Sequence, residues 1–459
     1  MPRPRYSRAL SIWMNGERVG LWRTPTRGTH TFAYDDRWLG SPHARPISLS
    51  LPLRPSGEPF RDGVEAFFDN LLPDNRGIRE RIQRRFQVPS IDPFDLLQAV
   101  GRDCVGALQL LPEDALPGDL SRITGDRLGS AQVARLLAAT LADPRDGDPP
   151  SEDHFRISLA GAQEKTALLW HEGAWHRPTG ATPTTHILKL PIGAGPQSID
   201  LSSSVENEWL CGRILKAYGI PTANSKIRRF GDYQVLVVER FDRRLSSDKT
   251  RWLRLPQEDL CQATATPPHL KYEVDGGPGI LKIMDLLQGS LRADEDRTNF
   301  LRTQVIFWLL AAIDGHAKNF SLFLLPQGDY ELTPRYDVLS AHPVIGHGRG
   351  KLSAQKATLA MAVLGKNRHY RIAEIECRHW LETANRCGMP GMRSIIADIL
   401  DQTPRVLDKV RAEIPKLFPE PVAEAILNGL NVQAEHLGRR MSTNWKSSAP
   451  DLVRLSSRS

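Results

Sequence analysis

The sequence predicts a mixed α/β (α+β) fold with two lobes, the first mainly β and the second mainly α-helical, behind an N-terminal α/β subdomain. Up to residue 241, apolar residues alternate in short runs bounded by turn residues, which favours strands. Beyond residue 241 they recur mainly at helical spacing. Proline, glycine and acidic residues concentrate in residues 138–153, which is typical of a linker.

We therefore expect five consecutive parts. They are an N-terminal subdomain (1–113), a connecting segment with the linker (114–153), a first lobe (154–241), a helical lobe (242–438) and a polar, serine-rich, disordered tail (439–459).

Length and composition describe an ordinary globular chain. Its 459 residues are enough for about three domains, and 40% of them are hydrophobic and 25% charged. We expect a cytoplasmic protein without membrane contact, because no long apolar stretch and no secretion signal stands out. The five cysteines lack metal-site or disulfide spacing and are expected to be reduced. The net charge of +7 favours an acidic partner or nearby nucleic acid without identifying either.

The N-terminal subdomain has clear strand and helix patterns. Asn15-Gly16 is a strong hairpin signal between two alternating runs. The patterns predict strands at 9–14, 18–22, 29–34 and 46–51 and helices at 64–72, 76–86 and 93–100. No catalytic constellation stands out, so this subdomain is expected to act as a scaffold or docking unit. The helix predicted at 76–86 is rich in arginine. Its arginines form either a solvated face or a surface that lies beside DNA; they are Arg76, Arg79, Arg81, Arg84 and Arg85.

The first lobe opens with a turn of small residues. The run FRISLAGAQEKTALLW indicates two strands around Ala160, Gly161 and Ala162. Small side chains let backbone N–H groups approach phosphate oxygens, although this turn taken alone fits a plain hairpin better. It is not a Walker A loop, because Glu164 stands where that motif needs glycine before Lys165.

A cation and a carboxylate are expected to face each other in the same lobe. The strand predicted at 185–190 carries Lys189 among apolar residues, and the helix predicted at 203–218 turns Glu208 toward its apolar face. A buried carboxylate needs a cation, so we expect these side chains to pair. Taken singly, Lys189 fits a snorkelling edge lysine and Glu208 a surface acid.

The stretch around which the rest of the chain is organised is FWLLAAIDGHAKNFSLFLLPQGDYELTPRYD, residues 307–337. An apolar run from 305 to 313 predicts a buried helix that ends at Asp314. Asn319 follows five positions later, and two short strands joined by the turn PQGD then deliver Asp337. Two carboxylates and one carboxamide are thus expected to converge beside one hairpin. The same spacing also occurs where a helix end is followed by incidental acids.

These residue types match the chemistry of phosphoryl transfer from ATP. Asp314 would position an attacking hydroxyl and accept its proton, whereas Asn319 and Asp337 would supply hard oxygen ligands to magnesium. Lys189 would hold the phosphates, and Glu208 would hold Lys189.

Two loops are expected to frame the nucleotide. The buried run 235–238 ends at Glu239, Arg240 and Phe241, where a two-lobed kinase fold turns between its lobes and offers backbone groups to adenine. The glycine-rich stretch KYEVDGGPG, residues 271–279, is expected to be mobile or to contact the substrate.

Several stretches closely resemble the successive signatures of one family, the HipA-type serine/threonine kinases, which are toxins of bacterial toxin–antitoxin modules. They are RISLAGAQEKTALL, TPTTHILKLPIG, VERFDRR, RLPQED, KYEVDGGPGI, DGHAKNFS and LTPRYD, within residues 155–341. The resemblance implies a protein-kinase-like fold with a β lobe and a helical lobe, and an enzyme that uses ATP and Mg2+. The N-terminal subdomain is similar to that of the family.

Carried over by motif, the resemblance makes Asp314 the catalytic residue and Asn319 and Asp337 the magnesium ligands. Ser158 stands where the autophosphorylated serine of the family does, and Glu208 supports Lys189. The implied ATP-binding positions are Ala160, Gly161, Ala162, Gln163, Glu164, Lys165, Lys189, Glu239, Arg240, Phe241, His316, Lys318, Asn319, Tyr336 and Asp337.

The resemblance also implies partners. A HipB-type helix-turn-helix antitoxin would neutralise the kinase and carry it to operator DNA, and the substrate would be glutamate-tRNA synthetase, whose phosphorylation arrests translation and growth. Two other interpretations stay open. One is a small-molecule phosphotransferase of the aminoglycoside-kinase type, which usually has His-Gly-Asp where this chain has Asp314-Gly315-His316. The other is a DNA-associated corepressor whose ATP site serves only its conformation.

Overall fold

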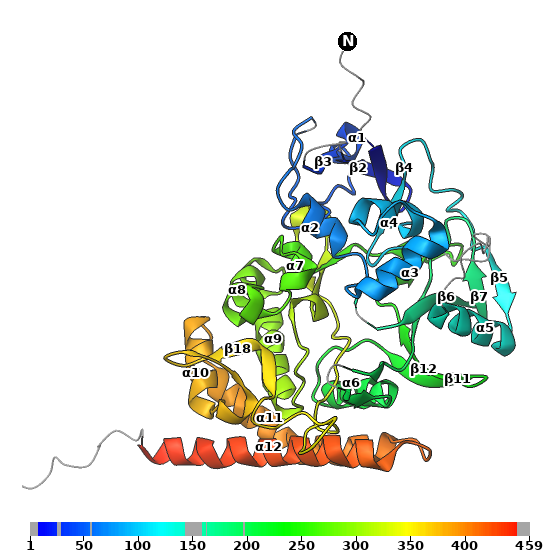
Figure 1. Ribbon diagram of the computed structural model, residues 1–459. Coiled ribbons are helices and arrows are strands. Elements are labelled where there is room, and N and C mark those ends of the chain that lie inside the picture. Colours follow the sequence, from blue (N-terminus) through cyan, green and yellow to red (C-terminus); the bar gives the residue numbers. More distant parts are fainter. Residues whose placement is uncertain are drawn as a thin grey trace, which may run out of the picture.

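The computed structural model describes residues 8–24, 29–55, 57–142, 158–161, 163–195 and 198–447 of the chain. Three units follow one another (Figure 1): the N-terminal subdomain, a first lobe built on a six-stranded sheet, and a helical lobe that ends in the long helix α12. Within these ranges no helix is long and apolar enough to cross a membrane.

The N-terminal subdomain is an antiparallel sheet with helices packed on it. Its strands, in the order β3-β2-β1-β4, are β1 Arg8–Met14, β2 Glu17–Thr24, β3 Thr31–Tyr34 and β4 Leu108–Pro112. Its helices are α1 Asp36–Leu39, α2 Val64–Asp69, α3 Arg76–Phe86 and α4 Pro93–Val100. Asn15 and Gly16 turn the first hairpin at φ +46° and +94°, as predicted.

The strand predicted at 46–51 is wrong. This stretch makes one isolated bridge, between Ser48 and Leu51. The Ser48 hydroxyl and the Leu49 N–H instead bond the carboxyl group of Glu258 in the helical lobe, so the Leu49 N–H is not available to a neighbouring strand.

The first lobe is a six-stranded antiparallel sheet between two helices. Its strands, in the order β11-β12-β8-β6-β7-β5, are β5 Gly125–Leu128, β6 Lys165–His171, β7 Ala174–Pro178, β8 His186–Lys189, β11 Ser225–Phe230 and β12 Tyr233–Glu239. Helix α5 Ser130–Leu141 packs on one face through Val133 and Leu137. Helix α6 Ser204–Ala217 shares a core with Leu236 and Val238 of β12.

The segment 114–153 is more than the connection that the sequence predicted. It supplies the edge strand β5 and helix α5, because Leu128, Val133 and Leu137 cover apolar side chains of the sheet. Residues 138–141 of the predicted linker therefore belong to α5, and the linker residues from 143 onward lie outside the described ranges.

The helical lobe holds the predicted hairpin and most of the helices. Its main helices are α7 Leu260–Ala263, α8 Ile280–Leu286, α9 Ala293–Leu309, α10 Cys377–Arg386, α11 Met392–Glu413 and α12 Glu420–Ser447. The hairpin strands β16 Ser321–Leu324 and β17 Tyr330–Leu332 form a sheet with β15 Gln257–Asp259. A second hairpin joins β18 Thr358–Leu364 and β19 Arg368–Arg371.

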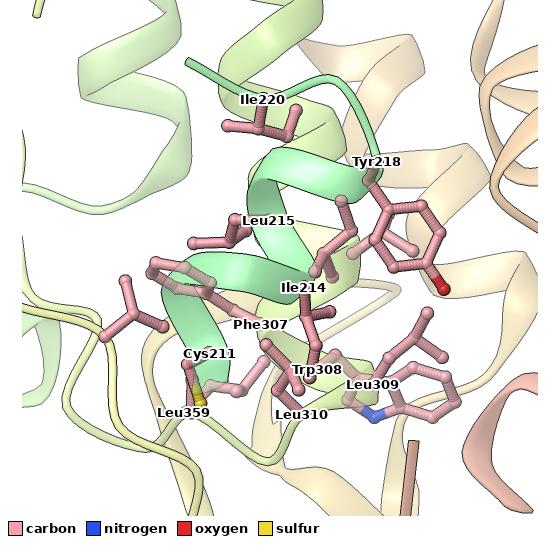
Figure 2. Close-up of a cluster of buried hydrophobic side chains, with 14 of the residues drawn as sticks. Cys211, Ile214, Leu215, Tyr218, Ile220, Phe307, Trp308, Leu309, Leu310 and Leu359 are labelled. Atoms are coloured by element: carbon pink, nitrogen blue, oxygen red, sulfur yellow. The ribbon is translucent and has the colours of Figure 1, made fainter. Parts of the chain in front are cut away.

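One hydrophobic core joins the two lobes. Figure 2 shows side chains of α6, among them Ile214 and Leu215, gathered with Phe307, Trp308 and Leu309 of α9. Helix α6 carries Glu208 and α9 leads into the loop of Asp314. The shared core therefore sets the position of the first lobe relative to the loop of Asp314.

Two predicted boundaries of the helical lobe are wrong. Helix α9 ends at Leu309, because Ala311 takes a left-handed φ of +48° while the Ala312 N–H bonds the Phe307 carbonyl in a Schellman cap. Asp314 thus lies in a loop beyond the helix.

Residues 439–447 of the expected disordered tail continue α12, which the buried Leu430 and Leu437 anchor. The tail from 448 onward lies outside the described residues.

Candidate active site

The predicted pair of Lys189 and Glu208 forms, and Asp337 joins it. The Lys189 Nζ lies 2.6 Å from Glu208 Oε1 and 3.0 Å from Asp337 Oδ1, and the side chains of Lys189 and Glu208 are buried. Burial opposes the lysine charge, but Asp337 and Glu208 outweigh it and raise the pKa of Lys189. Burial would raise the pKa of Asp337, yet Lys189 and Lys165 lower it to about 2. Burial raises the pKa of Glu208, and Lys189 opposes this shift.

Asn319 joins the loop of Asp314 to the loop of Asp337. Its Nδ2 donates to the backbone carbonyl of Asp314 at 2.7 Å and to that of Asp337 at 3.4 Å. Asp337 has a left-handed φ of +58°, a strained conformation for a residue with a side chain, and such conformations cluster at functional sites. The Asp314 side chain stays 51% exposed and is accessible to a substrate.

The turn of small residues in the first lobe lies close to Lys165. Gly161 has φ +108°, a backbone conformation that favours glycine, and a Cβ there would lie 2.6 Å from the Lys165 Nζ, which would have to move. Burial lowers the pKa of Lys165 to about 8, the charge of Asp337 opposes this shift and that of Lys189 adds to it. Binding a phosphate next to Lys165 would favour its charged form.

The N-terminal subdomain holds the predicted phosphate loop in place through several contacts. The Ser158 hydroxyl is buried and donates to the Leu71 carbonyl at 2.7 Å, and the Asp74 N–H donates to the Gly161 carbonyl at 3.2 Å. Glu164 pairs with Arg81 of the arginine-rich helix α3. Part of that helix therefore contacts the first lobe, which neither of the two interpretations of its arginines predicted.

The hinge residues differ in where their side chains point. Glu239 is exposed and accepts a hydrogen bond from Asn224, while Phe241 lies with its ring centroid 5.7 Å from that of Tyr336. The Arg240 side chain is fully engaged elsewhere: it bonds Asp242 and lies 3.5 Å from Asp103 of the N-terminal subdomain.

Asp103 is the centre of a buried charge network. Arg243 and Arg254 also pair with it, at 3.0 and 3.2 Å. Burial would raise the pKa of Asp103, but these arginines lower it below its usual range. The network fastens the N-terminal subdomain to the hinge, and nothing in the sequence indicated that these residues meet.

Lys318 also reaches the N-terminal subdomain. Its Nζ lies 3.0 Å from Asn70 Oδ1 and 3.1 Å from Asp74 Oδ1, and its backbone carbonyl accepts the Tyr336 hydroxyl at 2.9 Å. Burial would raise the pKa of Asp74, but Lys318 and Lys271 lower it to about 2. His316 is buried beside Asp314, and burial lowers its pKa.

One cavity collects most of the predicted residues. Those lining it are Ala160, Gly161, Lys165, Lys189, Glu239, Arg240, Phe241, Asp314, His316, Lys318, Asn319, Tyr336 and Asp337. Gln163 and Glu164 do not line it, because Gln163 donates to the Leu190 carbonyl and Glu164 faces Arg81. Ala162 lies outside the described residues.

The sequence did not predict that the N-terminal subdomain contributes residues to the wall of this cavity. Asn70, Leu71 and Asp74 line it beside the catalytic loop, although this subdomain was expected only to scaffold or dock. These residues show no catalytic spacing, and only the tertiary contacts bring them to the site. The contact of the Tyr272 hydroxyl with the Asp314 carboxylate was also not predicted, because only the tertiary structure brings these two side chains together.

The donor set fits magnesium. The Asn319 carboxamide nitrogen is bonded to backbone carbonyls, which leaves its oxygen as a ligand, and Asn319 and Asp337 line the same cavity. In the described ranges no group of three or more His, Cys, Asp or Glu side chains suits a metal ion. Magnesium in nucleotide sites needs fewer protein ligands, because phosphates and water complete its shell.

Comparisons with known proteins identify the family of this chain. The profile described as HipA-like C-terminal domain matches residues 157–407, and that of the HipA N-terminal domain matches residues 10–111. The chain is 33% identical over 420 residues to the putative kinase Y4mE of Sinorhizobium fredii, covering 90% of this chain and 94% of that protein. It is 30% identical over 331 residues to the serine/threonine-protein kinase toxin HipA of Shewanella oneidensis, covering 69% and 71%.

A solved structure shares the fold. It is the complex of HipA, HipB and operator DNA from Shewanella oneidensis, which matches with a TM-score of 0.76 at 24% identity and covers 95% of this chain and 98% of the solved one. The match supports a two-lobed arrangement behind an N-terminal subdomain.

Proposed function

This chain belongs to the HipA family of serine/threonine protein kinase toxins, and we propose that it transfers the γ-phosphoryl group of ATP to a protein hydroxyl with the help of Mg2+. The observation that carries the proposal is the buried contact of Lys189 with Glu208 and Asp337, directly beside the loop of Asp314 and Asn319. A lysine held by a helix glutamate, followed by these three residues, is the arrangement that phosphoryl transfer requires.

Each side chain has a defined task in this reaction. Lys189 binds the phosphates, and Glu208 keeps it oriented and charged. The exposed Asp314 carboxylate accepts a hydrogen bond from the substrate hydroxyl, whose oxygen attacks the γ-phosphorus. The bond from that phosphorus to the bridging oxygen breaks, ADP leaves, and the hydroxyl proton passes to Asp314. Magnesium, held by Asn319 and Asp337 when bound, neutralises phosphate charge.

Glutamate-tRNA synthetase is the substrate we propose, since the signature stretches of this chain resemble those of kinases that modify it. The phosphorylated synthetase no longer charges its tRNA, so translation and growth stop. A HipB-type antitoxin would neutralise the kinase and bring it to operator DNA. The Shewanella HipA of the same fold was solved together with HipB and its operator, which supports this assembly.

Autophosphorylation of Ser158 is proposed as the off switch. The hydroxyl is buried and donates to the Leu71 carbonyl, so the loop must leave this position before Ser158 can be modified. A phosphate removes the donor and places almost two negative charges beside a carbonyl oxygen. Once Ser158 is phosphorylated, the loop cannot return to the position that the unmodified loop occupies in this structure, and ATP binding is lost.

The test is phosphate transfer from labelled ATP by purified protein. Glutamate-tRNA synthetase, other synthetases, and an aminoglycoside are offered as acceptors, with Asp314→Asn as the inactive control. Label on the glutamate enzyme from wild type alone supports the proposal. Label on the aminoglycoside would favour the small-molecule phosphotransferase, and ATP binding without any transfer would favour the corepressor.

A further inference from the structure

Three consecutive residues, Lys271, Tyr272 and Glu273, tie three parts of the molecule together; we call them the strap. The Lys271 Nζ pairs with Asp74 Oδ2 of the N-terminal subdomain at 2.8 Å. The Tyr272 hydroxyl donates to Oδ1 of the catalytic Asp314.

Glu273 fastens the other end of the strap to the β18–β19 hairpin. Its Oε2 accepts the Ala362 N–H at 2.6 Å, and its Oε1 lies 3.2 Å from Arg368 Nε. The strap therefore spans from the N-terminal subdomain, across the catalytic carboxylate, to the far hairpin of the helical lobe.

The glycines after the strap allow close packing. The Gly277 N–H donates back to the Tyr272 carbonyl at 2.9 Å, and a Cβ on Gly277 would lie 2.2 Å from the Leu270 carbonyl oxygen. A Cβ on Gly279 would lie 2.4 Å from both carboxylate oxygens of Glu273. This stretch was expected to be mobile or to contact substrate, but its glycines let the chain fold tightly on itself and brace the strap.

The Tyr272 ring is held from two sides. It meets the His316 ring edge-on, with centroids 5.0 Å apart and planes at 87°, and the Lys271 Nζ lies 5.6 Å from its centroid. Its hydroxyl bonds one oxygen of Asp314. No described residue bonds the other oxygen, Oδ2, and the Asp314 side chain is half exposed.

We propose that Tyr272 is a positioning residue that holds the Asp314 carboxylate in its reactive orientation, and that the N-terminal subdomain supports it through Asp74 and Lys271. This role rests on the proposed kinase function. Fixing Oδ1 leaves Oδ2 free to accept the substrate hydroxyl, whereas an exposed carboxylate without this bond rotates among several orientations. Positioning of a reacting group acts on the chemical step more than on nucleotide binding.

The opposite role is a latch, in which the Tyr272 hydroxyl takes the place of the substrate hydroxyl on Asp314. A latch has to leave when substrate binds. Ion pairs hold the strap at Lys271 and Glu273, and the backbone of Gly277 closes on Tyr272, so the structure favours a permanent support. The two roles predict activity changes of opposite sign.

The experiment compares Tyr272→Phe with wild type, using labelled ATP with glutamate-tRNA synthetase and the kinase itself as acceptors. Loss of one hydrogen bond to a charged group predicts a fall in kcat of roughly 10- to 100-fold. The KM for ATP, the affinity for Mg-ATP and the melting temperature should stay near wild-type values, because phenylalanine keeps the ring. Tyr233→Phe, on β12, is the matched control and should keep full activity.

A Tyr272→Phe enzyme with wild-type or higher kcat overturns the positioning role, and a higher rate would establish the latch. Lys271→Met tests the link to the N-terminal subdomain: kcat should fall by a smaller factor, and an unchanged kcat overturns that link. If wild type labels neither acceptor while Mg-ATP still binds, the proposed kinase function itself fails. That outcome is distinct from an active wild type beside an equally active Tyr272→Phe.

Discussion

Substituting Lys189 or Glu208 alone should lower the free energy of unfolding considerably. Each single loss should be far more than half of the loss caused by the double substitution. Both side chains are buried and only 2.6 Å apart, so a single substitution leaves the partner uncompensated in the interior. Breaking a buried pair costs about 3–5 kcal/mol. The loss of stability for Glu208→Gln should lie near the lower end of this range, because the Asp337 carboxylate remains 3.0 Å from the Lys189 ammonium group.

The loss of stability for Lys189→Met should lie near the upper end of the roughly 3–5 kcal/mol range, since this substitution leaves the carboxylates of Glu208 and Asp337 without their shared cation. At about 2–4 °C per kcal/mol for a cooperative unit of roughly 150–250 residues, the two variants should melt roughly 6–20 °C below wild type. The double variant removes the lysine and one carboxylate together. It should be at least about 2 kcal/mol more stable than the sum of the single effects predicts.

The assay is thermal and urea unfolding without nucleotide for wild type, both single variants and the double variant. The surface pair Arg76 and Glu80, in the same N–O contact range at 2.8 Å but with an exposed arginine, provides the control cycle. Its coupling should be only about 0.3–0.5 kcal/mol. Strict additivity at Lys189 and Glu208, or a coupling no larger than that of the surface pair, would refute the reasoning.

Three further predictions concern the metal site, a buried acid and the phosphate loop. Asp337→Ala should weaken Mg-ATP binding in calorimetry much more than binding of ATP in EDTA, and an equal loss under both conditions would contradict the metal role. Burial raises the pKa of Glu258 to about 8 from the usual 4.5. Between these two pH values the native state keeps a proton on Glu258 that the unfolded state has released. The free energy of unfolding therefore falls as the pH rises from 4.5 to 8, and it levels off above pH 8. Urea unfolding of Glu258→Gln against wild type should show a stability difference that grows by up to about 1.4 kcal/mol per pH unit in this window, whereas a constant difference would count against a protonated Glu258. Ser158→Ala should keep activity and escape self-inactivation during incubation with ATP, as followed by mass spectrometry, and wild type fully phosphorylated at Ser158 yet equally active would exclude the switch.

Local sequence patterns determined the parts of the site that lie close together in the chain. Asp314, Asn319 and Asp337 are separated by one turn and one hairpin, and the short apolar run of β16 followed by the turn PQGD predicted the hairpin that brings the two loops together. The pairing of Lys189 with Glu208 was also readable, because strand and helix periodicity turned both side chains inward and a buried carboxylate needs a cation.

Other features depended on contacts between distant segments. Helix α9 ends at Leu309, before the predicted end at Asp314, because Ala311 takes a left-handed conformation that the sequence does not signal, since glycine is the usual residue there. Asp74 and Leu71 line the cavity of the candidate site, and Tyr272 reaches Asp314, although these residues have no spacing relation to residues 314–319. Sequence periodicity reports which face of an element is buried, but not which distant element will cover it, and that choice is made by the tertiary packing of the whole core.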